Sequence, residues 1–528
     1  MKKILALLFT VALAITCLTA CKSDVPTLSN VGGDVLSGNG TFAVEKGEYV
    51  YFVNGVATAY NDNEMGDVLK GALCRVKKNE VGVKNANVEV VIPKLVTTSS
   101  ATNGVFIYGN VVYYASPYDE KDKSGTIRSD YTDFRYFNLE NGDSERITYE
   151  DSSVSKYQFI QNASGSVYLA YECTETIDGA ETKVLKVVGT NGSQVYSVSK
   201  YSNLLFADNN ADKIYFSKAA YSESLKADEG FSEVYSYSVG KTEADLVFSG
   251  CGYNGLTRDG RGEDASYKAK IFSDEQGVYY TDFSGASVTL IKNTGKYLIM
   301  KVTGVDTNLA TAYYFGLDLS KPATVANLVE MGKSNTYIDT AIKTTSYVKS
   351  LTEIYYIENT TYLKGLVKFN YETLSTVTHG RTLVTGDASG YNISTAEGNY
   401  LYLSGSSGDY YRIDLATAGA KLKKINAVAL KGATEWFAPR VIDGKFIGVY
   451  SDSIYQGYLY AIDLKDIDNE DKDEDDKTLY DKYLEKYSEL ERDEVITLSE
   501  TIVGKMTSAD KDSFNTALDS TYPAKDQE

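Results

Sequence analysis

The sequence has little of the residue types on which many common enzyme chemistries depend. Its 528 residues include one histidine, one tryptophan, six prolines and five cysteines. The single histidine, His379, excludes multi-histidine metal sites, and a Ser-His-Asp or Cys-His arrangement would have to use it. Thr378-His379-Gly380 reads as a turn between strands, so a solvated turn histidine is the favoured interpretation.

Cysteine is too sparse and too widely spaced for a disulfide framework. Beyond residue 21 the chain holds Cys74, Cys173 and Cys251, an odd number without CxxC spacing. Disulfide-dense domains have an even and closely spaced set, and structural zinc sites use paired cysteines. We therefore expect buried apolar cysteines with at most one unassigned bridge, and no metal site.

Catalytic and phosphate-binding motifs are also missing. The sequence has no GxSxG, HExxH or Walker-type pattern, and it predicts no cofactor. The 72 acidic residues outnumber the 53 basic ones, which gives a formal charge of −19. A chain this acidic repels phosphate backbones, so we expect no nucleic acid among its partners.

Only the N-terminus carries a long apolar run. Lys2 and Lys3 precede an almost wholly apolar stretch from Ile4 to Cys17. A basic head, an apolar stretch and a small-residue cleavage site are typical of a secretory signal peptide. The run is shorter than the ~20 residues that a membrane-spanning helix needs.

The residues that close this run, Leu18-Thr19-Ala20-Cys21, resemble the lipobox of bacterial lipoproteins. The resemblance implies cleavage before Cys21, a diacylglycerol on its thiol and often an acyl chain on the new amino group. Two or three acyl chains give stable anchoring, so we expect the body to face the extracytoplasmic side of a cell membrane. The alternative is an ordinary signal peptide with Cys21 merely nearby.

Tyrosine, with 45 residues, is the compositional outlier. The tyrosines recur in strand-like runs that open on Gly, Asp, Asn or a similar turn residue. Examples are Val112-Tyr-Tyr, Ile354-Tyr-Tyr and Tyr400-Leu-Tyr. Most of these runs are followed by a second strand-like run and several by a third, with a fourth expected before the next copy.

The spacing of these runs predicts a β-propeller. They begin near residues 48, 111, 166, 212, 277, 353, 399 and 445. Four-stranded units of ~40–50 residues are typical of propeller blades. We predict an all-β fold with eight blades, keep seven and nine open, and expect residues 27–46 to complete the last blade. The rival architecture is an array of β-sandwich domains.

The paired tyrosines with Asn-containing turns resemble bacterial relatives of the low-density-lipoprotein-receptor-type β-propeller over roughly residues 40–464. The chain lacks a YWTD-type tetrapeptide, so the resemblance implies a fold more than an activity. The expected division is a signal peptide (1–20), a tether (21–39), the propeller (40–464), an acidic linker (465–477) and a helical tail (478–522).

Composition changes sharply after the propeller. Residues 466–477 read DIDNEDKDEDDK, a block that favours a solvated, extended linker over a calcium loop, because the required Gly and Glu positions do not match. Beyond it, Tyr480, Tyr483, Leu484 and Tyr487 fall on one face of a helix. We interpret this tail as a helical cap or hairpin, with a partner-binding module as the alternative.

Two loops are the candidate ligand-binding sites, because long polar loops carry function more often than short ones. One is the glycine-rich segment 250–264, and the other is the segment 118–125. A flexible surface insertion is the alternative interpretation of both. The candidate residues are Arg258, Asp259, Arg261, Glu263, Asp264, Tyr118, Asp119 and Glu120.

Three functions remain open. The favoured one is binding of a protein, peptide or glycan, since tyrosine offers a large contact area and a hydroxyl. The second is an Asp/Glu hydrolase or lyase, which would place two carboxylates ~5–9 Å apart in the central funnel. The third is a structural part of a cell-envelope assembly that docks through its tail.

Overall fold

The computed structural model describes the ring and most of its connections. The described residues are 37–54, 72–81, 86–92, 105–117, 131–152, 154–222, 227–249, 269–270, 279–280, 287–303, 312–323, 327–360, 364–370, 381–386, 390–405, 410–425, 433–435, 439–452 and 457–469. The predicted signal peptide and helical tail, together with Cys21, Cys251, His379 and Trp436, lie outside them.

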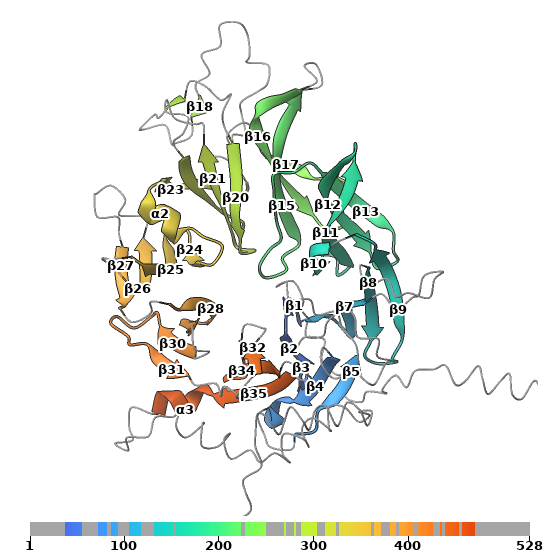
Figure 1. The fold of residues 1–528 in the computed structure, drawn as a ribbon, viewed down its shortest axis with the longest axis vertical. Coiled ribbons are helices and arrows are strands. Elements are labelled where there is room, and N and C mark those ends of the chain that lie inside the picture. The colour runs from blue at the N-terminus through green and yellow to red at the C-terminus, as the bar shows by residue number, and fades with distance from the viewer. Residues whose placement is uncertain are drawn as a thin grey trace, which may run out of the picture.

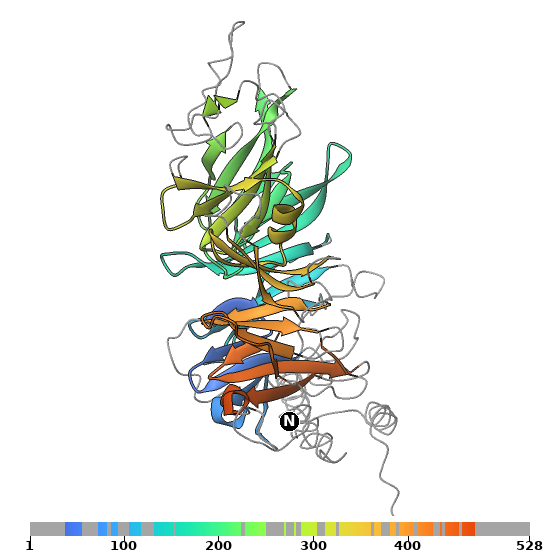
Figure 2. The same ribbon diagram turned by 90° about the vertical axis from the view of Figure 1, so that its left-hand side faces the viewer.

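Eight antiparallel sheets stand side by side around a central axis, so the predicted eight-bladed propeller is confirmed (Figure 1). In each blade the first strand lies toward the axis and the last toward the rim. Edge-on, the blades are twisted, as antiparallel sheets are (Figure 2).

Blades 1 to 4 have the following strands. Blade 1 comprises β2 (Ala43–Lys46), β3 (Tyr49–Asn54), β4 (Ala72–Lys77) and β5 (Glu89–Ile92), with the 3-10 helix η1 (Lys78–Glu80). Blade 2 comprises β6 (Val105–Tyr108), β7 (Val111–Pro117), β8 (Thr132–Asn138) and β9 (Ser144–Glu150), with β1 (Ser37–Thr41) added to β6. Blade 3 comprises β10 (Val154–Gln161), β11 (Val167–Ile177), β12 (Ala180–Gly189) and β13 (Gln194–Ser199). Blade 4 comprises β14 (Asn203–Leu205), β15 (Lys213–Ser222), β16 (Ala227–Ser238) and β17 (Asp245–Ser249).

Blades 5 to 8 continue the ring. Blade 5 comprises β20 (Ser287–Asn293), β21 (Tyr297–Thr303), β22 (Ala312–Asp318) and β23 (Leu328–Lys333), followed by α2 (Thr336–Ala341). Blade 6 comprises β24 (Tyr347–Ser350), β25 (Glu353–Asn359), β26 (Lys364–Asn370) and β27 (Arg381–Thr385). Blade 7 comprises β28 (Asn392–Glu397), β29 (Tyr400–Ser404), β30 (Tyr410–Asp414) and β31 (Lys423–Ile425). Blade 8 comprises β32 (Ala433–Glu435), β33 (Arg440–Ile442), β34 (Lys445–Asp452) and β35 (Gly457–Asp463), followed by α3 (Leu464–Asn469).

Tight turns set the register of the inner hairpins. Between β33 and β34, Asp443 and Gly444 have φ angles of 50° and 71°. Positive φ at both central residues defines a type I′ turn, whose twist matches that of the paired strands. Asp-Gly is a preferred sequence for this turn because glycine has no Cβ to clash there.

The tyrosine-rich runs are second strands in most blades, and one of them belongs to no blade. The run near residue 277 contributes only β19 (Tyr279–Tyr280), which pairs with β18 (Ala269–Lys270). Blade 5 instead uses β21, which begins at Tyr297. The step from 277 to 353 is the longest because it passes over this strand.

Residues 37–46, the described part of the segment 27–46 that was expected to close the ring, do not complete the last blade. β2 is the innermost strand of blade 1, and β1 pairs with β6 of blade 2, so neither adds to blade 8. Blade 8 packs directly on blade 1: Ile442 and Ile447 join a buried cluster with Phe52. The Lys445 ammonium also donates a 2.9 Å hydrogen bond to the carbonyl of Val81.

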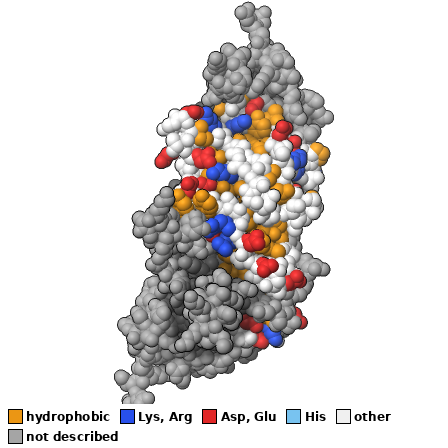
Figure 3. All heavy atoms as spheres, turned by 90° about the vertical axis from the view of Figure 1, so that its right-hand side faces the viewer, with side chains coloured by type: hydrophobic (Ala, Val, Ile, Leu, Met, Phe, Trp, Pro, Cys, Tyr) orange, Lys and Arg blue, Asp and Glu red, His pale blue; other side chains and the backbone are white. Residues whose placement is uncertain are grey.

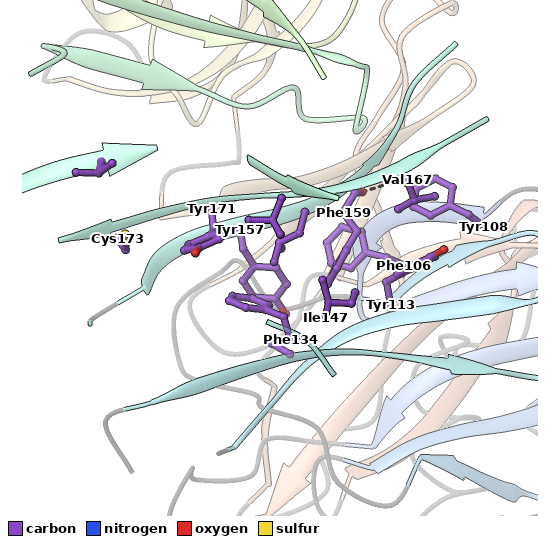
Figure 4. Packing of buried hydrophobic residues seen from close by; sticks show 14 residues of the cluster. Phe106, Tyr108, Tyr113, Phe134, Ile147, Tyr157, Phe159, Val167, Tyr171 and Cys173 are labelled. Atoms are coloured by element: carbon purple, nitrogen blue, oxygen red, sulfur yellow. Dashed lines mark hydrogen bonds between the residues drawn. The ribbon is translucent and has the colours of Figure 1, made fainter. Parts of the chain in front are cut away.

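Neighbouring blades are joined by buried aromatic and aliphatic side chains. Figure 4 shows this layer between blades 2 and 3, where Phe134 packs between Tyr157 and Tyr171. The Tyr108 hydroxyl donates a 2.7 Å hydrogen bond to the carbonyl of Phe159 across the same interface. Cys173 lies in this layer as a free buried thiol.

The acidic block begins as a helix rather than as an extended linker. α3 follows β35 directly and covers the residues at the start of the predicted linker. Leu464 and Ile467 are buried, and the Arg412 guanidinium donates to the carbonyl of Leu464 at 3.3 Å. The buried side chains of Leu464 and Ile467 therefore keep the start of the acidic block packed on the ring.

We predict that Phe446→Ala destabilises the protein by about 3–5 kcal/mol, because it empties a fully buried position. The ring of Phe446 in blade 8 lies 5.6 Å from that of Tyr402 and 5.2 Å from that of Tyr410, both in blade 7. These contacts join the two blades. Chemical unfolding followed by circular dichroism measures the change. Leu383→Ala, at a position 44% exposed, is the control and should change stability by less than about 0.5 kcal/mol. Equal effects would contradict this packing.

Candidate ligand-binding face

The two faces of the ring carry different kinds of connection. In blades 1 to 7 successive strands are antiparallel, so their connections alternate between the faces; in blade 8, β32 and β33 both pair with β34 and together occupy the first strand position. We call the face with the first-to-second and third-to-fourth strand connections the turn face. The opposite face, the loop face, has the second-to-third strand connections and the connections between blades.

The segment 118–125 lies between β7 and β8, whose connection starts and ends on the loop face. The segment 250–264 lies between β17 and β18, and β17 ends on the loop face. The candidate residues of both segments lie outside the described residues. Both segments thus start on one side of the ring, although blade 3 stands between their starting points.

A lysine held between two glutamates lies at this face between blades 2 and 3. The Lys186 ammonium is 2.8 Å from a carboxylate oxygen of Glu150 and 2.7 Å from one of Glu175. Glu150 ends β9 of blade 2, whereas Lys186 and Glu175 belong to blade 3. The Tyr171 hydroxyl also donates to Glu150 at 3.0 Å.

This arrangement stabilises charge rather than transferring protons. The two glutamate oxygens are at most about 5.5 Å apart, within the range used by glycosidases. Burial alone would raise the pKa of Glu150, but hydrogen bonds from Lys186, Ser152 and Tyr171 outweigh it and lower that pKa. Burial would lower the pKa of Lys186, but its bonds to both glutamates raise it. A general acid needs a carboxyl that stays protonated, so Glu150 does not fit that role.

A second buried glutamate lies between blades 3 and 4. Glu172 accepts hydrogen bonds from Ser155 at 2.6 Å and Tyr201 at 2.7 Å, and Lys183 lies 3.2 Å away. Burial would raise the pKa of Glu172, but these hydrogen bonds and the charge of Lys156 lower it. Glu172 is therefore an ionised part of the core.

Two further carboxylates near the loop face are paired in the same way. Asp133 is fully buried and receives hydrogen bonds from Arg135 at 2.9 Å and Arg146 at 2.7 Å. Asp339 of α2 accepts from the Tyr314 hydroxyl at 2.6 Å and lies 3.3 Å from the Lys301 ammonium. Each cluster ties neighbouring strands or elements together.

The sequence analysis missed these clusters, although one signal was available. Glu172 interrupts the otherwise apolar run Leu169-Ala-Tyr-Glu-Cys173, and a charged residue in a buried strand needs partners. The partners come from other strands and from other blades. Their positions in the sequence therefore give no indication of the contact.

Most tyrosines of the described chain are core residues. The binding function favoured from composition instead relied on tyrosine side chains that offer their contact area to a ligand. Tyr51, Tyr114, Tyr171, Tyr314 and Tyr356 are all buried. Several tyrosine hydroxyls donate to carboxylates, as in the pairs of Tyr356 with Glu358 and Tyr235 with Glu233. The aromatic ring fills the space between blades while the hydroxyl satisfies a buried acceptor.

The described surface has no strong single-sign field on the side drawn in Figure 3. Acidic and basic side chains lie close together, with hydrophobic side chains between them. Elsewhere in the described chain, exposed Tyr149 stacks on Tyr131, with ring centroids 5.8 Å apart. This pair is a described aromatic surface beside the start of β8, where segment 118–130 ends.

Within the described ranges, no group of three or more His, Cys, Asp or Glu side chains could hold a metal ion. The helices described are also too short or too polar to span a bilayer. Cys74 and Cys173 are buried free thiols, as expected, and burial raises the pKa of Cys173 to about 11.

Fold and face together define the class: an all-β, eight-bladed propeller. No family model matches the chain, and no curated protein matches it. Among solved structures, the chain is similar to one from a study of two prolyl endopeptidases, with 9% identity and a TM-score of 0.39. The match covers 69% of this chain and 48% of that one, so the matched region spans about half of that protein.

Two other solved structures show the same fold-level similarity. The β-propeller domain of the Trilobed protease from Pyrococcus furiosus is 10% identical, with a TM-score of 0.33, and the match covers 81% of this chain and 96% of that one. The polysaccharide lyase Uly1 is 9% identical, with a TM-score of 0.34, and the match covers 84% and 94%. Similarities at this level extend to the fold alone.

We predict that Glu172→Gln weakens the dependence of stability on pH. The pKa of folded Glu172 lies below its usual 4.5, so its ionised form stabilises the fold above the unfolded pKa. This contribution disappears as the pH falls through the folded pKa. Urea unfolding at pH 7 and pH 3 should show a larger loss for the wild type than for Glu172→Gln, which is already weakened at pH 7 by about 1–3 kcal/mol.

The matched control is Glu181→Gln, at an exposed position on β12 of the same blade. This variant should keep the pH dependence of the wild type. If Glu172→Gln also keeps it, the buried glutamate does not stabilise the fold through its charge.

Proposed function

We propose that this chain is a lipid-anchored extracytoplasmic protein whose propeller binds a protein, peptide or glycan at its loop face. The anchor would be a diacylglycerol on Cys21, as the lipobox-like residues imply. Binding would involve the segments 118–125 and 250–264, which connect strands at that face.

The state of the paired carboxylates Glu150, Glu172 and Asp339 is the observation that favours binding over catalysis. Glu150, Glu172 and Asp339 each have a lowered pKa because hydrogen-bond donors and lysines surround them. A carboxylate-based hydrolase or lyase requires one carboxyl that holds a proton at working pH. These three carboxylates instead act as ionised links between strands and blades.

Two alternatives remain as proposals with their own tests. A carbohydrate-active enzyme would require an acid and a base outside the clusters described above. A structural component of an envelope assembly would bind its partner through residues 478–522.

We predict that Cys21→Ser prevents lipid attachment and releases the protein from the membrane. The thiol is the acceptor of the diacylglycerol in the proposed processing, and serine is not a substrate for it. Fractionation of cells with and without the substitution measures the effect. Lys22→Ala is the matched control and should leave the protein in the membrane fraction. Retention of Cys21→Ser in the membrane would contradict the anchor.

Binding and turnover should be measured together on the same glycan and peptide arrays. The proposal predicts retention of at least one ligand class without product formation. Tyr118→Ala and Arg258→Ala should reduce retention, whereas Lys241→Ala, in an exposed turn of the opposite face, should not. Product formation would support the enzyme alternative. If neither binding nor product formation is seen, and deletion of residues 478–522 causes loss of a partner, the assembly role would be supported.

A further inference from the structure

The N-terminal strand runs along the inner side of the ring. β1 pairs antiparallel with β6, the innermost strand of blade 2, and lies toward the axis from it (Figure 1). It also contacts β2 of blade 1 and β10 of blade 3. The described chain therefore begins on the inner side of the ring rather than at its rim.

The register fixes the side from which the chain enters. Ser37 lies opposite Ile107, close to the turn that joins β6 to β7, and Thr41 lies opposite Val105. The β6–β7 turn belongs to the turn face. The chain thus passes from the turn face at Ser37 toward the loop face at Thr41, and then returns as β2.

The length of chain before Ser37 limits where a lipid on Cys21 can lie. Sixteen residue steps separate Cys21 from Ser37. They span roughly 55 Å when fully extended and about 22 Å as a root-mean-square coil. A relaxed tether would therefore keep Cys21 within roughly 22 Å of Ser37, on the turn-face side of the ring.

A route to the other face exceeds the relaxed reach of this tether. A path across blade 2 from β1 to β9 crosses four strand spacings, about 19 Å, and the seven residues of β9 add about 23 Å. The sum is roughly 42 Å, about twice the root-mean-square reach of ~22 Å. Placing the loop face on the bilayer would therefore stretch the tether to about three-quarters of its full length.

We infer that the turn face is the membrane-facing surface of this propeller and that the loop face points away from the bilayer. The inference rests on the proposed lipid anchor at Cys21. It deepens the proposed function, because it presents the segments 118–125 and 250–264 to ligands outside the membrane. It also makes β1 a part of the channel wall.

Lipidated full-length protein in phosphatidylcholine vesicles tests this orientation. Two variants, Ala180→Cys and Gln194→Cys, place a fluorophore at exposed positions of blade 3, on the loop face and the turn face respectively. They lie about 26 Å apart along β12, at ~3.3 Å per residue. Both variants also carry Cys251→Ser, so that the fluorophore does not react with Cys251. Cys74 and Cys173 are buried and need no substitution.

A headgroup-attached quencher in the vesicle lipid reports which label approaches the bilayer. The expected result is loss of emission from the Gln194→Cys label and retention by the Ala180→Cys label. Equal loss from both labels, or the reverse order, overturns the orientation. Detergent-released protein is the control and should show no difference between the labels.

Intact-mass analysis of the same samples separates this inference from the proposal on which it rests. A mass without lipid on Cys21 overturns both the anchor and the orientation. A lipid-modified mass combined with equal or reversed quenching overturns the orientation alone and leaves the proposed anchor standing.

Discussion

The closure of the ring is the constraint on which the rest of the structure depends. A propeller has to join its last blade to its first, and here the joint is a packed side-chain interface rather than an exchanged strand. Ile442 and Ile447 of blade 8 pack with Phe52 of blade 1, and Lys445 reaches the carbonyl of Val81. The described N-terminal strand is not used at this joint: β1 pairs with β6 on the inner side of blade 2.

The same mode of packing is repeated around the ring. Tyrosine suits it because one side chain can fill the space between two sheets and also donate a hydrogen bond to a buried carboxylate. The contact of Tyr171 with Glu150 links blades 3 and 2, and that of Tyr201 with Glu172 links the connection after blade 3 to that blade. Lysines then balance the charge, so the buried acidic groups stabilise the ring near neutral pH and cease to do so in acid.

The sequence predicted the repeated unit well because its signal is local. Runs such as Val112-Tyr113-Tyr114 combine strand propensity with a preceding turn, and both depend on neighbouring residues. It failed where pairing depends on residues far apart, as in the contact of β1 with β6 and in the use of β21 instead of β19. The clusters around Glu150 and Glu172 were missed for the same reason, since their partners come from other strands. The candidate loops stay predictions, because they lie outside the described residues.

Hydrogen exchange of two soluble chains, one starting at residue 22 and one at residue 42, tests the central claim most directly. If β1 lines the channel beside β6, removing it should speed exchange in residues 105–108 and leave residues 457–463 unchanged. If the N-terminal residues instead complete blade 8, exchange should speed in residues 457–463 and stay unchanged in 105–108. The second result would contradict both the closure described here and the orientation inferred from it.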